Sequence, residues 1–133
     1  MDTSDLFHLF NQKQRLFMKE LNACIEPFGL FASQWTIVYT IYQHGKMTQT
    51  DLWKYLEVEA PTTTRTLKRM EDSGWIVREM GNDKRERIVE LTPKAKESYS
   101  SIMKEIKRME QNFLQQFQEE EIQQLHHLLN KLG

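Results

Sequence analysis

Apolar side chains recur every three or four residues over two stretches at the start of the chain, and this spacing predicts two helices. The first covers residues 5–28, with Ser4 and Asp5 as its N-terminal caps. The second begins at Ser33, a favoured N-cap residue, and ends at Gly45. The apolar positions that set the two periods are Leu6, Phe10, Phe17, Leu21, Cys24 and Phe28 in the first helix, and Trp35, Val38, Ile41 and Tyr42 in the second.

The middle of the chain has the spacing of a helix-turn-helix followed by a β-hairpin. Thr48 caps a short helix, and a longer helix begins at Pro61, because proline is favoured at the first helical position. Gly74 ends that helix, since glycine is the usual residue just past a helix terminus. Two runs rich in strand-forming residues, 75–80 and 87–91, flank a Gly-Asn-Asp turn. A hairpin directly after a helix-turn-helix is a wing.

Two more amphipathic helices complete the chain, one starting at Thr92-Pro93 and one over residues 119–132. We therefore expect a mainly α fold with a small β-hairpin wing: one domain of residues 1–133 with a winged helix-turn-helix lobe at residues 33–91. The apolar stripes outside this lobe need a partner surface. They comprise Tyr99, Ile102, Ile106, Met109, Phe113 and Phe117 in the long helix, and Ile122, Leu125, Leu128, Leu129 and Leu132 in the last.

The helix that begins at Pro61 has an apolar side and a basic side. At 100° per residue, Thr63, Leu67, Met70 and Gly74 face the core. The opposite side holds cations and hydroxyls with no acid before the last turn, a composition that suits the major groove of duplex DNA. A solvated basic face on an ordinary helical domain is an equally good interpretation of this helix alone. The outward residues are Thr62, Thr64, Arg65, Lys68 and Arg69.

Cations at the tip of the hairpin favour the DNA interpretation. Lys84, Arg85 and Arg87 lie at or beside the turn, and the negative potential of a narrow minor groove attracts such side chains. Asp83 is expected to orient the wing by a bidentate ion pair with Arg85. The alternative for Asp83 is a simple turn former, a common use of aspartate.

Composition adds limits on the function. The formal net charge of −1 argues weakly against nucleic acid, but binding depends on the local patch and not on the average. No apolar run is long enough to span a membrane, and the start of the chain is acidic, so we expect a cytoplasmic protein without a membrane partner. No catalytic or phosphate-binding motif is present, and His126 and His127 point about 100° apart on one helix. We therefore expect no enzyme activity, no metal and no cofactor.

The combined motifs resemble the MarR family of multiple-antibiotic-resistance-type regulators. The most specific part is the Asp-x-Arg of the wing followed six residues later by Leu-Thr, together with the spacing of Arg65 and Gly74. The quoted matches are Leu52, Val58, Pro61-Thr62-Thr63-Thr64-Arg65, Met70-Glu71-Asp72-Ser73-Gly74-Trp75-Ile76, Asn82-Asp83-Lys84-Arg85 and Val89-Glu90-Leu91-Thr92. The chain departs from the pattern at Thr63, where an aliphatic residue is usual, and at Ala60, where a capping residue is usual.

The resemblance implies a triangular homodimer that binds duplex DNA and usually represses transcription. The dimer would be built from residues 5–28 and 93–132, with Arg65 in the major groove and Arg85 in the minor groove. Many members release DNA when a small aromatic ligand binds or when a cysteine is oxidised. Winged-helix domains also serve as protein-interaction modules, and the net charge of −1 keeps that alternative open.

Two further sites have competing interpretations. Cys24 is the single cysteine; it is either a redox sensor or an inert core thiol, and its place on the apolar stripe favours the core. Phe17, Trp35 and Tyr39 either line a ligand cavity or belong to the core, which aromatic residues also dominate.

Overall fold

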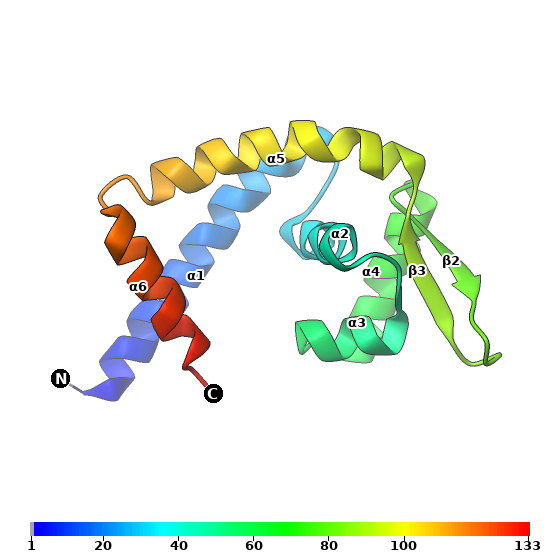
Figure 1. The fold of residues 1–133 in the computed structure, drawn as a ribbon, viewed down its shortest axis with the longest axis horizontal. Coiled ribbons are helices and arrows are strands. Elements are labelled where there is room, and N and C mark those ends of the chain that lie inside the picture. The colour runs from blue at the N-terminus through cyan, green and yellow to red at the C-terminus, as the bar shows by residue number, and fades with distance from the viewer. Residues whose placement is uncertain (1) are drawn as a thin grey trace.

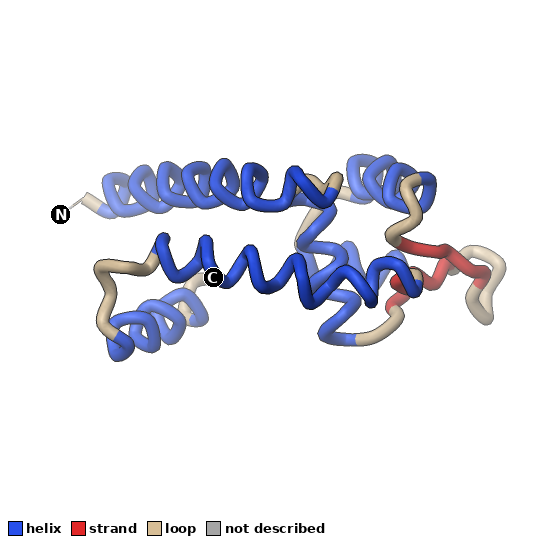
Figure 2. Tube along the Cα trace, turned by 90° about the horizontal axis from the view of Figure 1, so that it is seen from above, coloured by secondary structure: helices blue, strands red, loops and turns tan. Residues whose placement is uncertain are grey.

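The computed structural model describes residues 2–133 and confirms the predicted fold class, a mainly helical chain with a small wing. Figure 1 shows α5 as a long helix that connects a winged-helix lobe at one end with α6 at the other. We call α1, α5 and α6 the stem, and residues 32–91 the lobe. The stem helices are α1 (Thr3–Ile25), α5 (Pro93–Phe113) and α6 (Glu119–Asn130). Seen from above, the wing projects at the end opposite α6 (Figure 2).

The first helix begins earlier and ends earlier than the pattern predicts. The carboxylate of Asp2 accepts a hydrogen bond from the backbone N–H of Ser4 at 2.9 Å and is the N-cap of α1. The assignment of Ser4 and Asp5 as caps was therefore wrong, because both residues lie inside the first turn. After Ile25 the chain tightens into a 3₁₀ turn, η1 (Glu26–Phe28), so residues 5–28 are not one continuous α-helix.

The start of α2 (Ala32–His44) is set by tertiary contacts. Asn22 on α1 accepts the backbone N–H of Ala32 at 2.7 Å, and the Gln34 side chain accepts that of Phe31 at 3.0 Å. Two N–H groups that a helix start leaves unpaired are thus satisfied without Ser33. The prediction of Ser33 as N-cap was wrong, since this residue lies within α2.

The lobe follows the predicted order closely. Its elements are α3 (Gln49–Leu56), α4 (Ala60–Asp72), β2 (Ile76–Met80) and β3 (Arg87–Leu91). Thr48 caps α3 as predicted, its hydroxyl accepting the N–H of Asp51 at 3.1 Å. A two-residue strand, β1 (Met47–Thr48), pairs with β3 and gives an antiparallel sheet in the order β1-β3-β2. Two residues are too short to produce a periodic signal.

One apolar core joins the lobe to the stem. Leu21 and Ile25 of α1 are buried in it together with Ile102 and Ile106 of α5. Tyr99 of α5 stacks on Trp35 and Tyr42 of α2, with ring centroids 5.3 Å and 3.5 Å apart. The lobe contributes Ile37, Val38, Leu52, Leu67, Met70, Ile76 and Val89, each almost fully buried.

Candidate nucleic-acid interface

Helix α4 has the two faces that its sequence predicts. Leu67 and Met70 are fully buried, and Thr63 is buried beside them. The Thr63 hydroxyl donates to the carbonyl of Glu59 at 2.9 Å, which satisfies its polar group inside the core. Thr63 can therefore occupy a position where an aliphatic side chain is expected.

The opposite face of α4 is exposed and basic. Thr62, Thr64, Arg65, Lys68 and Arg69 are all solvent-accessible. Lys68 pairs with Asp72 at 3.0 Å, but both side chains are more than half exposed, so this ion pair is weak and exchangeable. In the part of the chain that the structure describes, the guanidinium groups of Arg65 and Arg69 make no hydrogen bond or ion pair. Their donors are available to an anionic partner.

The C-terminal end of α4 is fastened to the stem. Gly74 has a φ of +84°, a left-handed conformation in which a side chain would be strained. Its carbonyl accepts the Thr92 hydroxyl at 2.6 Å, and the same oxygen of Thr92 accepts the N–H of Ala95 to cap α5. Lys94 donates to the carbonyl of Ser73 at 3.0 Å and lies over the ring of Trp75. Both predictions, Gly74 as helix end and Thr92 as cap, are confirmed.

The wing tip is closed by contacts to its own backbone. The Asp83 carboxylate accepts the backbone N–H of Arg85 at 3.0 Å, so it forms a local turn and not the expected ion pair with the Arg85 side chain. Arg87 donates to the carbonyls of Lys84 and Glu86 at 3.0 and 3.1 Å, which turns its guanidinium onto the tip. That part of the Asp83 prediction was wrong because a carboxylate reaches an N–H two residues away at little entropic cost.

Two cations of the wing tip are exposed to solvent. The side chains of Lys84 and Arg85 are exposed and, over residues 2–133, have no hydrogen-bond or ion-pair partner. The base of the turn is tight: a Cβ on Gly81 would lie 2.9 Å from the Cβ of Glu86. Glycine is therefore required for the hairpin to close beneath these cations.

Both basic surfaces lie on the same lobe. Helix α4 runs from the end of α3 toward the start of α5, and the turn of the wing lies at the end of the lobe away from α5 (Figure 1). A helix with exposed Arg and Thr side chains, beside a hairpin with a basic tip, can contact a groove and the adjoining backbone of one duplex.

Sequence reasoning missed the ion pair between α4 and the wing. The guanidinium of Arg78, on β2, donates to both carboxylate oxygens of Glu71 at 3.1 and 3.3 Å, and to Gln49 at 3.3 Å. Hydrogen bonding to Arg78 lowers the pKa of Glu71. A usable signal existed, because Arg78 falls two residues after Ile76 in an alternating strand, at a position that should face the core.

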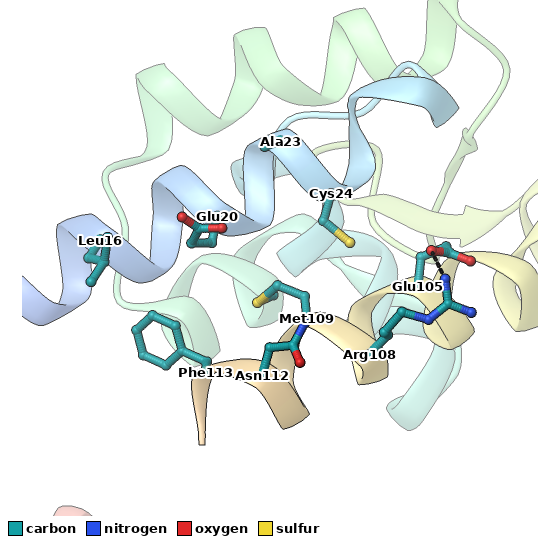
Figure 3. Close-up of a pocket in the computed structure, with 9 residues that line it drawn as sticks. All are labelled: Leu16, Glu20, Ala23, Cys24, Glu105, Arg108, Met109, Asn112 and Phe113. Atoms are coloured by element: carbon teal, nitrogen blue, oxygen red, sulfur yellow. Dashed lines mark hydrogen bonds and ion pairs between the residues drawn. The ribbon is translucent and has the colours of Figure 1, made fainter. Parts of the chain in front are cut away.

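Cys24 lies in a groove of about 500 Å³ between α1 and α5. Figure 3 shows its sulfur directed toward the groove, with Met109 and Arg108 on the facing helix. Burial, and then the carboxylate of Glu105, raise the pKa of the Cys24 thiol. A protonated thiol reacts slowly with oxidants, so this environment favours the inert interpretation.

The three aromatic residues considered for a ligand cavity do not line one shared space, because they pack against different partners. Phe17 packs edge-on against Phe113 of α5, with centroids 5.4 Å apart. Trp35 is buried against Tyr99, and Tyr39 is exposed at the edge of that aromatic row. These positions suit the core interpretation for Phe17 and Trp35.

Two features bear on other classes of protein. No helix among the described residues is long and apolar enough to cross a membrane. Within residues 2–133, no three His, Cys, Asp or Glu side chains converge as metal ligands would.

Comparisons with known proteins agree with this geometry. Residues 30–86 match the model of the MarR family. An uncharacterized HTH-type transcriptional regulator of Bacillus subtilis strain 168, YwoH, is 45% identical over 92% of this chain and 90% of its own. A cysteine-to-serine mutant of Escherichia coli MarR, complexed with operator DNA, superposes with a TM-score of 0.89 at 26% identity, covering 96% of this chain and 92% of that one. Reduced AbfR bound to DNA has a TM-score of 0.76 at 28% identity, with coverages of 96% and 95%.

The expectation that the chain is not an enzyme agrees with these relatives, which are a transcriptional regulator and two proteins bound to DNA. The family model, the relative at 45% identity and the structural neighbours together identify this chain as a member of the MarR family of DNA-binding transcription regulators.

Proposed function

We propose that this regulator is a homodimeric repressor that binds a pseudo-palindromic operator. Arg65 and the threonines beside it read base edges in the major groove, while Lys68, Arg69 and Lys84 contact phosphates. Arg85 anchors each wing in the minor groove. The observation that carries the proposal is that four of the cations on α4 and the wing tip have no hydrogen-bond or ion-pair partner for their side chains within residues 2–133; these are Arg65, Arg69, Lys84 and Arg85.

The apolar surface of the stem supports the homodimer. Large apolar side chains of α1 and α6 face a shared hollow of about 370 Å³. An exposed apolar patch of this kind marks an interaction site. A second copy would cover it symmetrically and set the two α4 helices about 34 Å apart, one turn of DNA. The hollow is lined by Leu6, Phe7, Phe10, Leu125, Leu128, Leu129 and Leu132.

Fluorescence anisotropy across a salt series tests the DNA part. Labelled duplex from the region upstream of the protein's own gene should bind tightly, with affinity that falls steeply as salt rises. Arg85→Ala should weaken binding to every sequence, whereas Arg65→Ala should also relax base preference. Wild-type affinity in Arg65→Ala would contradict the assignment of base reading.

The protein-interaction alternative makes the opposite prediction for the same titration. If the basic surface serves a protein partner, neither the upstream duplex nor random duplex should bind, even at low salt. Transcription in vitro from the upstream promoter then tests the sign of regulation. A repressor should lower transcript yield in proportion to operator occupancy, and an increase in yield would show activation.

We propose further that the repressor releases DNA when a small aromatic ligand binds in the groove between α1 and α5 (Figure 3). Its volume lies in the range of small-molecule pockets, and its wall sets Arg108 beside Met109 and Phe113. Arg108 is paired with Glu105 at 3.2 Å, and an aromatic carboxylate would replace Glu105 as the partner of the guanidinium. Benzoate at millimolar concentration should release wild-type protein from DNA but not Arg108→Gln. Retention of DNA by the wild-type protein would contradict this site.

Redox control through Cys24 is the remaining alternative. The raised pKa of this thiol argues against it. Wild-type protein and Cys24→Ser should bind the operator equally before and after hydrogen peroxide. Release of the wild-type protein alone would establish the redox function.

A further inference from the structure

Arg78 occupies an unusual position in the wing. Its strand alternates, so Ile76, Arg78 and Met80 share one face of the sheet, and Ile76 is buried there. Across the sheet Arg78 is paired with Val89, which is fully buried. Residues directly opposite in an antiparallel pair lie on the same side of the sheet. This arginine therefore sits on the core-facing side of the hairpin, where only 18% of its side chain is exposed.

The contacts of Arg78 join three elements of the lobe. Two guanidinium nitrogens meet both carboxylate oxygens of Glu71 in the last turn of α4, and a third donates to Gln49 at the start of α3. We call these three residues the clamp. A two-point pair between a guanidinium and a carboxylate fixes direction as well as distance, unlike apolar packing or a lysine.

The clamp lies where a small change in the angle between α4 and the hairpin would move the wing tip. The chain passes from α4 to β2 through Ser73 and Gly74, and the free cations of the tip lie six and seven residues beyond Arg78. The hairpin folds back between Asp83 and Lys84, so the tip is roughly 15 Å from the clamp at about 3.3 Å per strand residue. A rotation of about 10° there would move the tip by roughly 2.6 Å, close to the length of a hydrogen bond.

We propose that Arg78, through Glu71 and Gln49, is a positioning residue that sets the angle between the recognition helix and the wing. Both then engage one duplex at the same time. This inference rests on the proposed DNA-binding function and adds to it a basic residue that acts from inside the lobe and does not touch DNA.

A double-mutant cycle tests the proposal on the full-length protein. Arg78→Met removes the guanidinium and keeps an unbranched stem, while Arg85→Ala removes the wing anchor. Arg78→Met should lower operator affinity by about 10- to 100-fold and reduce the salt slope to that of Arg85→Ala. Because the wing is already misplaced, adding Arg85→Ala to Arg78→Met should cost little more. Effects that multiply would overturn the proposal.

Two further variants separate positioning from stability and from charge. Arg78→Lys keeps the charge but cannot form the two-point pair, so it should show the reduced salt slope of Arg78→Met. A wild-type salt slope in Arg78→Lys would contradict the role of the two-point pair with Glu71. Glu71→Gln, which retains a hydrogen-bond acceptor, should show the same reduced slope, and it serves as the test if Arg78→Met fails to fold. Lys107→Met breaks the Lys107–Glu110 ion pair of the stem and is the control that should leave the slope unchanged.

The outcomes distinguish this inference from the function on which it rests. Absence of salt-dependent binding by the wild-type protein would remove the proposed function. Normal wild-type binding, with an unchanged salt slope in a folded Arg78→Met variant, would remove only the role of the clamp.

Discussion

The lobe and the stem carry similar apolar stripes but bury them differently. In the lobe, Leu52, Leu67 and Met70 are fully buried by other elements of the same chain. In the stem, Phe7 is 51% exposed on α1 and Leu128 is 57% exposed on α6. The lobe therefore buries its apolar side chains within one chain, together with parts of α1 and α5, whereas the N-terminal half of α1 and α6 leave theirs exposed. Burial, and not periodicity, distinguishes the two regions.

Breaking the proposed partner surface should have the largest effect. Leu128→Asp would bury one unpaired carboxylate per protomer in the proposed dimer. Because a two-fold interface contains both copies, the dimer would bear the free-energy cost of two buried carboxylates. We expect self-association to weaken by at least about 1,000-fold, or roughly 4 kcal/mol. Sedimentation velocity should then show a monomer. Gln123→Asp, on the polar side of α6, is the matched control, and a dimer in both variants would contradict the role of the hollow.

Truncating a buried side chain in the lobe core should lower the unfolding free energy of each chain. Leu67→Ala removes a fully buried side chain from α4 and should cost about 2–5 kcal/mol of unfolding free energy. Urea denaturation followed by tryptophan fluorescence measures this loss. Thr62→Ala on the exposed face of α4 should cost less than about 0.5 kcal/mol. Equal losses at the two positions would show that the two faces of α4 are wrongly assigned.

A substitution at Thr92, where the lobe meets α5, should lower the unfolding free energy by a smaller amount. The Thr92 hydroxyl caps α5 and also donates to the carbonyls of Gly74 and Trp75, so Thr92→Ala removes three hydrogen bonds, of which the one to Trp75 is long at 3.4 Å. We expect a loss of about 1–2 kcal/mol in thermal or urea unfolding. Thr92→Ser keeps the hydroxyl and should recover most of that stability. If serine does no better than alanine, the hydroxyl is not the stabilising group.

The smallest expected change is a gain in stability in the lobe. Glu57 ends α3 with a φ of +54°, the one positive φ found among the described non-glycine residues. Glu57→Gly should raise the unfolding free energy by about 0.5–1 kcal/mol, since a left-handed backbone disfavours any Cβ. Thermal melting measures the gain. Destabilisation would mean that the Glu57 side chain, or the lower entropy of its unfolded chain, outweighs the strain.

Local patterns determined much of the lobe. The buried and exposed faces of α4, the stop at Gly74 and the caps Thr48 and Thr92 all follow from signals within a few residues, because helix periodicity and capping act over one or two turns. The motif spacing was also enough to indicate the family. The same local signals predicted that the cations of α4 and of the wing tip are exposed.

Contacts between distant residues decided the rest. Asn22 caps a helix ten residues away, and Arg78 reaches Gln49 across 29 residues. Phe17 packs on Phe113 instead of joining Trp35. Such contacts depend on how elements are brought together in space, and no local period encodes their geometry. Within α4 the sequence by itself determined which residues face inward or outward; only the tertiary structure decided which of the other apolar stripes are buried and what each side chain touches.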